Sequence, residues 1–182
     1  SLDLSNFDTS NVTNMSEMFL GSVATTIKGL EKFNTSKVKN MSQMFNDAKA
    51  TTLDLSSFDT SNVTDMSWMF SGSAATTIKG LEKFNTSNVT NMSSMFQGSK
   101  ATSLDLSNFD TSNVTNMGTM FYNSKATTLD LSSFDTSKVT SMYYMFTNAK
   151  ATTGYARTQE DADRFNASSG KPSGLTFVVK SQ

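Results

Sequence analysis

Hydrophobic positions recur along this chain with a fixed period. The phrase Met-x-x-Met-Phe occurs six times, every 25 or 26 residues, and it contains all 12 methionines. A second phrase, Phe-Asp/Asn-Thr-Ser, keeps the same step from Phe7 to Phe134. A period in this range predicts a solenoid, because a coil that cannot bury its own apolar face shares a continuous core with the coils stacked on it.

The pattern within one coil predicts a strand, a turn and a short helical turn. Residues 53–56, Leu-Asp-Leu-Ser, alternate apolar and polar positions, as in a strand with one buried face. Residues 59–61, Asp-Thr-Ser, favour a turn. Met66, Met69 and Phe70 have the i, i+3, i+4 spacing of one helical face. We therefore expect a right-handed parallel stack of short strands of the α/β leucine-rich-repeat type, with paired neighbours about 4.8 Å apart.

Two kinds of coil alternate in the first part of the chain. The second and fourth repeats read Ile-Lys-Gly-Leu-Glu-Lys-Phe and are one residue longer than the others. Their inserted glycines, Gly29 and Gly80, predict a β-bulge. The outward strand positions form a column of mostly alternating charge: Asp3, Lys28, Asp54, Lys79, Asp105 and Asp130. Alternation of sign favours the register of a parallel stack, and the last two aspartates are expected to repel.

The chain divides into a six-coil solenoid, residues 1–153, and a C-terminal cap of the same domain, residues 154–182. Residues 158–161, Thr-Gln-Glu-Asp, resemble a helix start, and Ala162 and Phe165 would face the stack. Residues 175–179 are expected to form a closing strand, since an open end exposes core and unpaired backbone groups.

The N-terminal end looks cut, because the chain begins within a repeat. We expect Leu2, Leu4 and Phe7 to expose core there and to allow weak self-association, and we interpret the chain as a fragment of a longer protein.

Composition removes several functional classes. With 15 basic and 16 acidic residues the net charge is −1, so no overall basic field is available for nucleic acid. No apolar run is long enough to span a bilayer, so we expect no membrane insertion by this fragment. Cysteine and histidine are absent, which excludes disulfides, Ser-His triads and ordinary zinc sites. We expect no cofactor and no metal.

Two aspartates raise the question of catalysis. Asp105 and Asp130 would lie about 5 Å apart by rung spacing, as in a retaining glycosidase, which would make the protein a polysaccharide-acting enzyme. They belong, however, to a column that recurs along the whole stack. We therefore expect no enzyme.

Ligand-binding candidates lie where the regular repeat becomes irregular. The two middle residues of Met-x-x-Met and the residue after Phe form three columns that are expected to point away from the core, Ser67 among them. Most members are Ser, Thr, Asn, Gln or Glu, but four are aromatic: Trp68, Tyr122, Tyr143 and Tyr144. Exposed aromatics can stack on sugars or anchor a protein partner. The alternative is ordinary scattered surface aromatics.

The repeated phrases resemble a known family. Val-Thr-Asn-Met-Ser-x-Met-Phe, as in residues 12–19 and 89–96, followed by Leu-Asp-Leu-Ser-x-Phe-Asp-Thr-Ser-Asn, as in residues 53–62 and 104–113, closely resembles the BspA-type leucine-rich repeats of bacterial surface proteins. The resemblance covers roughly residues 1–153. The return segments depart from it, because they lack the Cys and Leu that many relatives carry there.

The resemblance implies an extracellular protein attached to a bacterial cell surface. Such proteins are associated with adhesion to host glycoproteins, mucus or extracellular matrix proteins. We therefore predict a non-catalytic adhesion or ligand-binding module. The alternative is a stalk or spacer that presents another domain and contacts nothing itself.

Overall fold

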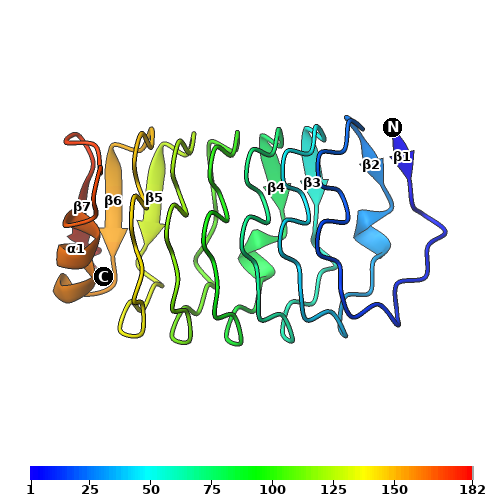
Figure 1. Ribbon diagram of the computed structural model, residues 1–182, viewed down its shortest axis with the longest axis horizontal. Coiled ribbons are helices and arrows are strands. Elements are labelled where there is room, and N and C mark those ends of the chain that lie inside the picture. Colours follow the sequence, from blue (N-terminus) through cyan, green and yellow to red (C-terminus); the bar gives the residue numbers. More distant parts are fainter. Residues whose placement is uncertain (182) are drawn as a thin grey trace.

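The computed structural model describes residues 1–181 and is a β-solenoid of about seven turns, with short parallel strands stacked along its long axis (Figure 1). We number coils 1 to 6 from their first strand positions, Leu2, Ile27, Leu53, Ile78, Leu104 and Leu129. The strands are β1 (Leu2–Asp3), β2 (Ile27–Lys28), β3 (Thr52–Asp54), β4 (Thr77–Lys79), β5 (Thr128–Leu131), β6 (Thr153–Ala156) and β7 (Thr176–Val179). The predicted parallel stack is confirmed.

The repeated methionines and phenylalanines form a shared core. Every member of the six Met-x-x-Met-Phe copies is buried except Met18 in coil 1 and Met142 in coil 6. The phenylalanines of these copies stack face to face, with ring centroids 5.2 Å apart for Phe19 and Phe45 and 6.0 Å apart for Phe121 and Phe146. Each coil therefore completes its core with side chains of its neighbours, as the period predicts.

The Met-x-x-Met-Phe segments are linked turns, so the predicted helical turn is wrong there. The residue before the second methionine lies in the left-handed region in every coil, with φ 59° at Trp68 and 49° at Tyr144. Such a residue ends any helical run. The apolar spacing is instead satisfied by successive turns, such as the Met69 N–H donating to the Met66 carbonyl at 3.3 Å.

These linked turns carry a backbone ladder that runs through all six coils in residues 1–181. Alternate N–H groups donate to the next coil, as from Met66 to Asn91 (3.1 Å) and from Trp68 to Ser93 (2.9 Å). Bridges join Asn14, Asn40, Asp65, Asn91, Asn116 and Ser141 in sequence. A continuous set of backbone bonds between neighbouring coils therefore lies on the methionine edge.

The strand edge is interrupted, against the expectation of continuous pairing. β1 pairs with β2, β3 with β4, and β5 with β6 and then β7. At the junctions between these groups phenylalanine rings stack instead: Phe33 on Phe58, Phe84 on Phe109 and Phe109 on Phe134, with centroids 6.2–6.3 Å apart. Strand pairing and ring stacking thus alternate along this edge.

The extra residue of coils 2 and 4 forms a 3-10 turn in place of the predicted bulge. The turns η1 (Leu30–Lys32) and η2 (Leu81–Lys83) follow Gly29 and Gly80, each with φ 94°. A Cβ atom on Gly80 would lie 2.6 Å from the carbonyl carbon of Leu55, so only glycine fits. The glycine lets each longer coil approach the shorter coil before it.

The recurring Asp/Asn-x-Ser phrases are Asx turns at three corners of a coil. In coil 3 the carboxylates of Asp54, Asp59 and Asp65 accept the backbone N–H two residues later, at 3.2, 3.0 and 2.8 Å. The hydroxyl of Ser56 also donates to Asp54 and, with the backbone bond, lowers the pKa of that carboxyl. The local sequence therefore bends the chain where the solenoid requires a corner.

The C-terminal cap has the predicted helix and strand. The helix α1 (Gln159–Asn166) begins at Thr158, whose hydroxyl accepts the Asp161 N–H at 3.1 Å, and it buries Ala162 and Phe165. β6 continues the stack with Gly154 opposite Leu129. No helix within residues 1–181 is long and apolar enough to cross a bilayer.

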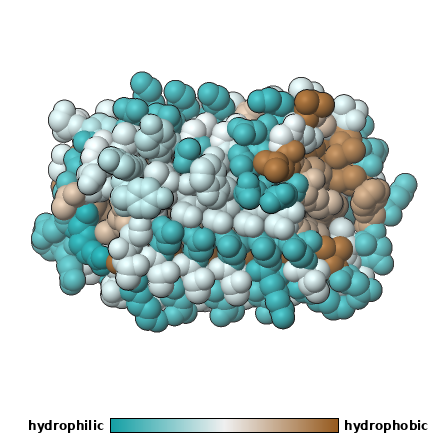
Figure 2. Space-filling view, in the orientation of Figure 1, coloured by the Kyte–Doolittle hydropathy of each residue, from teal (hydrophilic) through white to brown (hydrophobic). Residues whose placement is uncertain are grey.

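The opposite end exposes hydrophobic side chains. Figure 2 shows apolar residues gathered at the N-terminal end of the molecule. The exposed apolar residues of coil 1 are Leu2, Phe7, Met18, Leu20 and Val23. The expectation is confirmed for Leu2 and Phe7 but wrong for Leu4, which is buried because it already packs in the core.

Candidate functional site

Two of the four candidate aromatics form an exposed pair in coil 6. The side chains of Tyr143 and Tyr144 are 55% and 52% exposed. Their ring centroids are 6.1 Å apart and the rings meet edge to face at 87°. Both rings of the pair are therefore open to solvent at the C-terminal end of the methionine edge.

The Tyr143 ring is seated on the backbone of the preceding coil. Equivalent positions in coils 1 to 4 are serine, but coil 5 has Gly118. A Cβ atom on Gly118 would lie 2.5 Å from Cε1 of Tyr143. Two neighbouring departures from the repeat therefore fit each other: glycine removes the side chain that would collide with the tyrosine ring. In the sequence, this fit is indicated by glycine in coil 5 and tyrosine in coil 6 at the position where coils 1 to 4 have serine.

A shallow depression adjoins this tyrosine. It has a volume of about 310 Å³ and lies between coil 6 and the C-terminal end of α1. It is lined by Met142, Tyr143, Arg164, Ala167, Ser168 and Ser169. The Ser168 hydroxyl donates to the Met142 carbonyl at 3.1 Å, and Arg164 donates to carbonyls of coil 6. An aromatic wall beside hydroxyl groups suits a small polar ring such as a sugar.

Trp68 and Tyr122 lie apart from the pair. Trp68 occupies the same column as Tyr144 but three coils away, about 14 Å by rung spacing. It is 40% exposed, whereas Tyr122 is half-buried, so the expected exposure holds for Trp68 and is incomplete for Tyr122.

The outward columns are also less exposed than expected. Ser67 and Ser93 are buried, because the ladder on this edge brings adjacent coils into contact.

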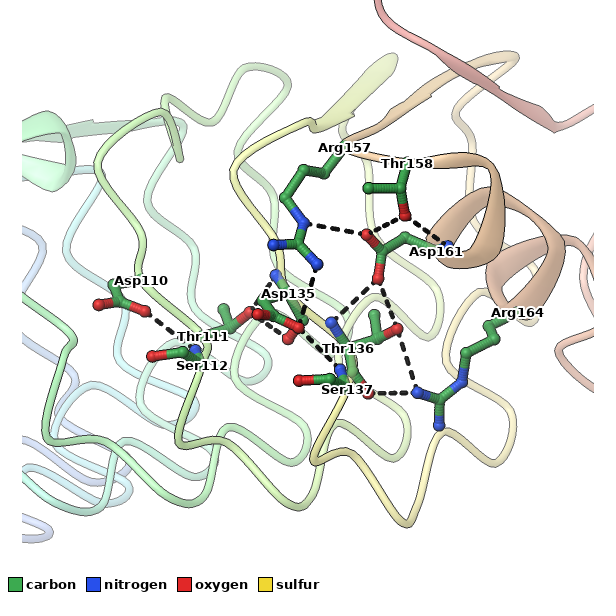
Figure 3. A network of polar contacts seen from close by, with 10 residues as sticks. All are labelled: Asp110, Thr111, Ser112, Asp135, Thr136, Ser137, Arg157, Thr158, Asp161 and Arg164. Atoms are coloured by element: carbon green, nitrogen blue, oxygen red, sulfur yellow. Dashed lines mark hydrogen bonds and ion pairs between the residues drawn. The ribbon is translucent and has the colours of Figure 1, made fainter.

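The buried carboxylate of Asp161 holds the cap on coil 6 (Figure 3). Within the stack, each Thr of the Asp/Asn-Thr-Ser phrase bonds to the next coil: the Thr111 hydroxyl donates to the Asp135 carbonyl at 2.8 Å and accepts its N–H at 2.8 Å. After coil 6, the Thr136 hydroxyl and N–H both donate to Asp161 Oδ1, at 2.7 and 3.1 Å. A side-chain carboxylate thus replaces the backbone carbonyl of a further coil.

Two arginines complete this network. Arg157 Nε donates to Asp161 Oδ2 at 3.1 Å, and its other end pairs with Asp135 at 3.2 Å. Arg164 donates to the Thr136 carbonyl and to the Val139 carbonyl at 2.6 Å. Burial by itself raises the pKa of Asp161, but hydrogen bonds from Thr136, Thr158 and Arg157 outweigh it and the net pKa is lowered. The sequence revealed the helix start but not this use of its aspartate.

The aspartates of the outward strand column serve local structure. Asp105 and Asp130 accept the N–H groups of Ser107 and Ser132, each at 3.1 Å. Asp130 also pairs with Lys180 of the cap, so the expected repulsion is relieved by a residue that sequence reasoning did not place there. Within residues 1–181 no group of three or more Asp or Glu side chains could hold a metal ion.

Comparison with known proteins gives one family. Its description is "Mycoplasma protein of unknown function, DUF285", and its model matches residues 1–78 and 73–169. No curated protein and no solved structure matches the chain.

Proposed function

The chain belongs to this repeat family of unknown function, and from that premise we propose that it is a non-catalytic adhesion or ligand-binding module of a bacterial surface protein. The proposed partners are host glycoprotein, mucin or extracellular matrix protein, met outside the cell. The finer identification with BspA-type leucine-rich repeats remains an inference from the repeated phrases.

The observation that carries the proposal is the seated, exposed pair Tyr143–Tyr144 beside the depression. Neither ring is needed to fill the core, because both are exposed. Coil 4 folds with Ser93 and Ser94 at the equivalent positions. Aromatic rings offer apolar faces to sugars and to protein anchors at small entropic cost. Seating on Gly118 further limits the freedom that Tyr143 would lose on binding.

The test uses residues 1–182 and immobilised mucin and matrix proteins. The double variant Tyr143→Ser/Tyr144→Thr copies residues of sibling coils, so its melting temperature should stay close to that of the parent. Binding should fall at least tenfold, about 1.4 kcal/mol. Gly118→Ser, which keeps both tyrosines but displaces the Tyr143 ring, should weaken binding as well.

Matched controls separate this site from general apolar contact. Val178→Ser removes an exposed apolar side chain of β7 and should bind normally. Trp68→Ser and a triple Tyr122/Tyr143/Tyr144→Ser variant show whether the surface extends along the coil stack. Unchanged binding in all aromatic variants would sink the proposal, and no binding by the parent protein would favour the spacer.

A further inference from the structure

Three lysines form a column at the corner where one coil returns to the next strand. Lys100, Lys125 and Lys150 occupy equivalent positions in coils 4, 5 and 6: the Lys125 N–H donates to the Ser99 carbonyl at 3.2 Å, and the Lys150 N–H to the Ser124 carbonyl at 3.0 Å. Neighbouring backbones are therefore about 4.8 Å apart along the stack. We call these three residues the lysine column. Figure 2 shows hydrophilic residues along the edge at which the strands of Figure 1 begin.

The lysine column has no internal counter-charge. None of the four ion pairs found within residues 1–181 includes any of its members. The aspartates of coils 5 and 6 lie at least five residues from each lysine along the chain and accept hydrogen bonds in their own turns. Three adjacent ammonium groups repel one another, by about 1 kcal/mol per close pair in water before salt screening.

The fold does not need charge at this position. The equivalent positions are Val23 in coil 1, Lys49 in coil 2 and Ala74 in coil 3, where the Ala74 N–H makes the equivalent bond to coil 2 at 2.9 Å. The fold does not require the positive charges of these lysines. An external anion that binds along the column offsets the repulsion between them.

We propose that the lysine column binds an anionic polysaccharide laid along the solenoid axis. Regularly spaced ammonium groups match a linear polymer with repeated sulfate or carboxylate groups, each of which can accept hydrogen bonds from a lysine. Nucleic acid fits less well because the whole chain has net charge −1 and the column has no arginine to grip phosphates. A membrane surface fits less well because polybasic membrane sites use clusters of four to eight basic residues.

This inference rests on the proposed function in one respect, since it assigns a charge to the glycans that the module meets. It uses a different surface from the tyrosine pair. A Tyr143→Ser/Tyr144→Thr variant should keep its polysaccharide binding, so the two proposals fail separately.

The experiment measures binding of residues 1–182 to a heparin column and to size-defined heparin oligosaccharides by calorimetry at low salt. Lys100→Ala/Lys125→Ala/Lys150→Ala copies Ala74 and should fold normally while its affinity falls at least tenfold. The charge-matched control Lys32→Ala/Lys39→Ala/Lys83→Ala removes three exposed lysines elsewhere and should bind within twofold of the parent.

Several outcomes would overturn the proposal. They are absence of binding by the parent protein, an equal loss in both triple variants, and equally tight binding of duplex DNA or of phosphatidylserine vesicles. Loss confined to the lysine-column variant, with neutral dextran failing to compete, supports it.

Discussion

At the scale of the residue, this protein uses a small set of local devices at the same place in every coil. Asx turns form corners, and a residue with positive φ precedes the second methionine of each copy. Bulky Trp68 is held in that backbone conformation by both neighbouring coils, because its N–H donates to the Ser93 carbonyl and the Ser67 carbonyl before it accepts the Gln43 N–H. The residue type at such positions can therefore vary, whereas the methionines beside them are constrained by the shared core.

Met69 provides the test of the shared core. Met69→Asp buries a carboxylate with no partner between stacked coils and should cost several kcal/mol, a large part of the stability of a small domain. Thr52→Asp, at an exposed position beside the same coil, should cost less than about 1 kcal/mol. Thermal unfolding of both variants measures the difference. Equal melting temperatures would contradict the arrangement of the core.

At the scale of the element, glycine and aspartate decide how coils join. Gly80 permits a backbone approach that no other residue allows, and Asp161 supplies an acceptor where the backbone of a further coil is missing. Each feature acts on the coil before it, so its effect is visible only once the coils are stacked.

Gly80→Ala should destabilise the solenoid by more than about 1 kcal/mol, because the new Cβ collides with the backbone of Leu55 and the φ of 94° is strained for alanine. Gly98→Ala in the same coil is the control: its φ is 63° and the nearest atoms to an added Cβ are 3.8 Å away. Denaturant unfolding should rank Gly80→Ala as clearly the less stable. The reverse order would refute close approach as the role of this glycine.

The cap should be sensitive to acid through Asp161. The folded-state pKa is lower than the unfolded value of 3.8, so the stabilisation is complete above that pH and is lost as pH falls through the folded-state pKa. Asp161→Asn should remove about 1–3 kcal/mol at neutral pH and reduce the acid dependence. Asp163→Asn, on the exposed side of α1, should do neither. Melting temperatures from pH 2 to 7 test both, and matching profiles would exclude this role.

The sequence predicts the stack, the shared core and the cap because each depends on short phrases that repeat or stand out locally. It mispredicts the methionine segment because the i, i+3, i+4 spacing suits linked turns as well as a helix. The interrupted strand edge, the burial of Ser67 and the Lys180–Asp130 pair depend on neighbouring coils, which no single repeat describes. For the candidate site, exposure of Tyr143 and Tyr144 was predictable, whereas the seat on Gly118 needed the register of adjacent coils.

At the scale of the whole molecule, the two ends are unlike. The C-terminal end is closed by α1 and β7, and the N-terminal end exposes Leu20, Val23 and their apolar neighbours. Exposed apolar surface next to unpaired strand backbone favours association. A polypeptide of residues 1–182 is therefore expected to pair weakly through coil 1.

Sedimentation over a concentration series should show a dimer of residues 1–182. The variant Leu20→Asn/Val23→Lys copies Asn46 and Lys49 of coil 2, so it should fold normally and remain monomeric. Val178→Ser at the capped end should associate as the parent does. A parent protein that stays monomeric at high concentration would contradict the prediction.

The fit of each longer coil to the shorter coil before it limits how such a chain can change in length. From Leu2 to Leu53, and again from Gly29 to Gly80, the sequence advances by 51 residues (53 − 2 and 80 − 29). Duplication or deletion of that unit keeps every glycine opposite a backbone that makes room for it. Shorter coils can also be added singly, as coils 5 and 6 show. A longer coil placed after another longer coil would have no shorter coil before it whose backbone its glycine could approach. Inherited changes in coil number are then expected to add or remove a longer coil only together with the shorter coil before it.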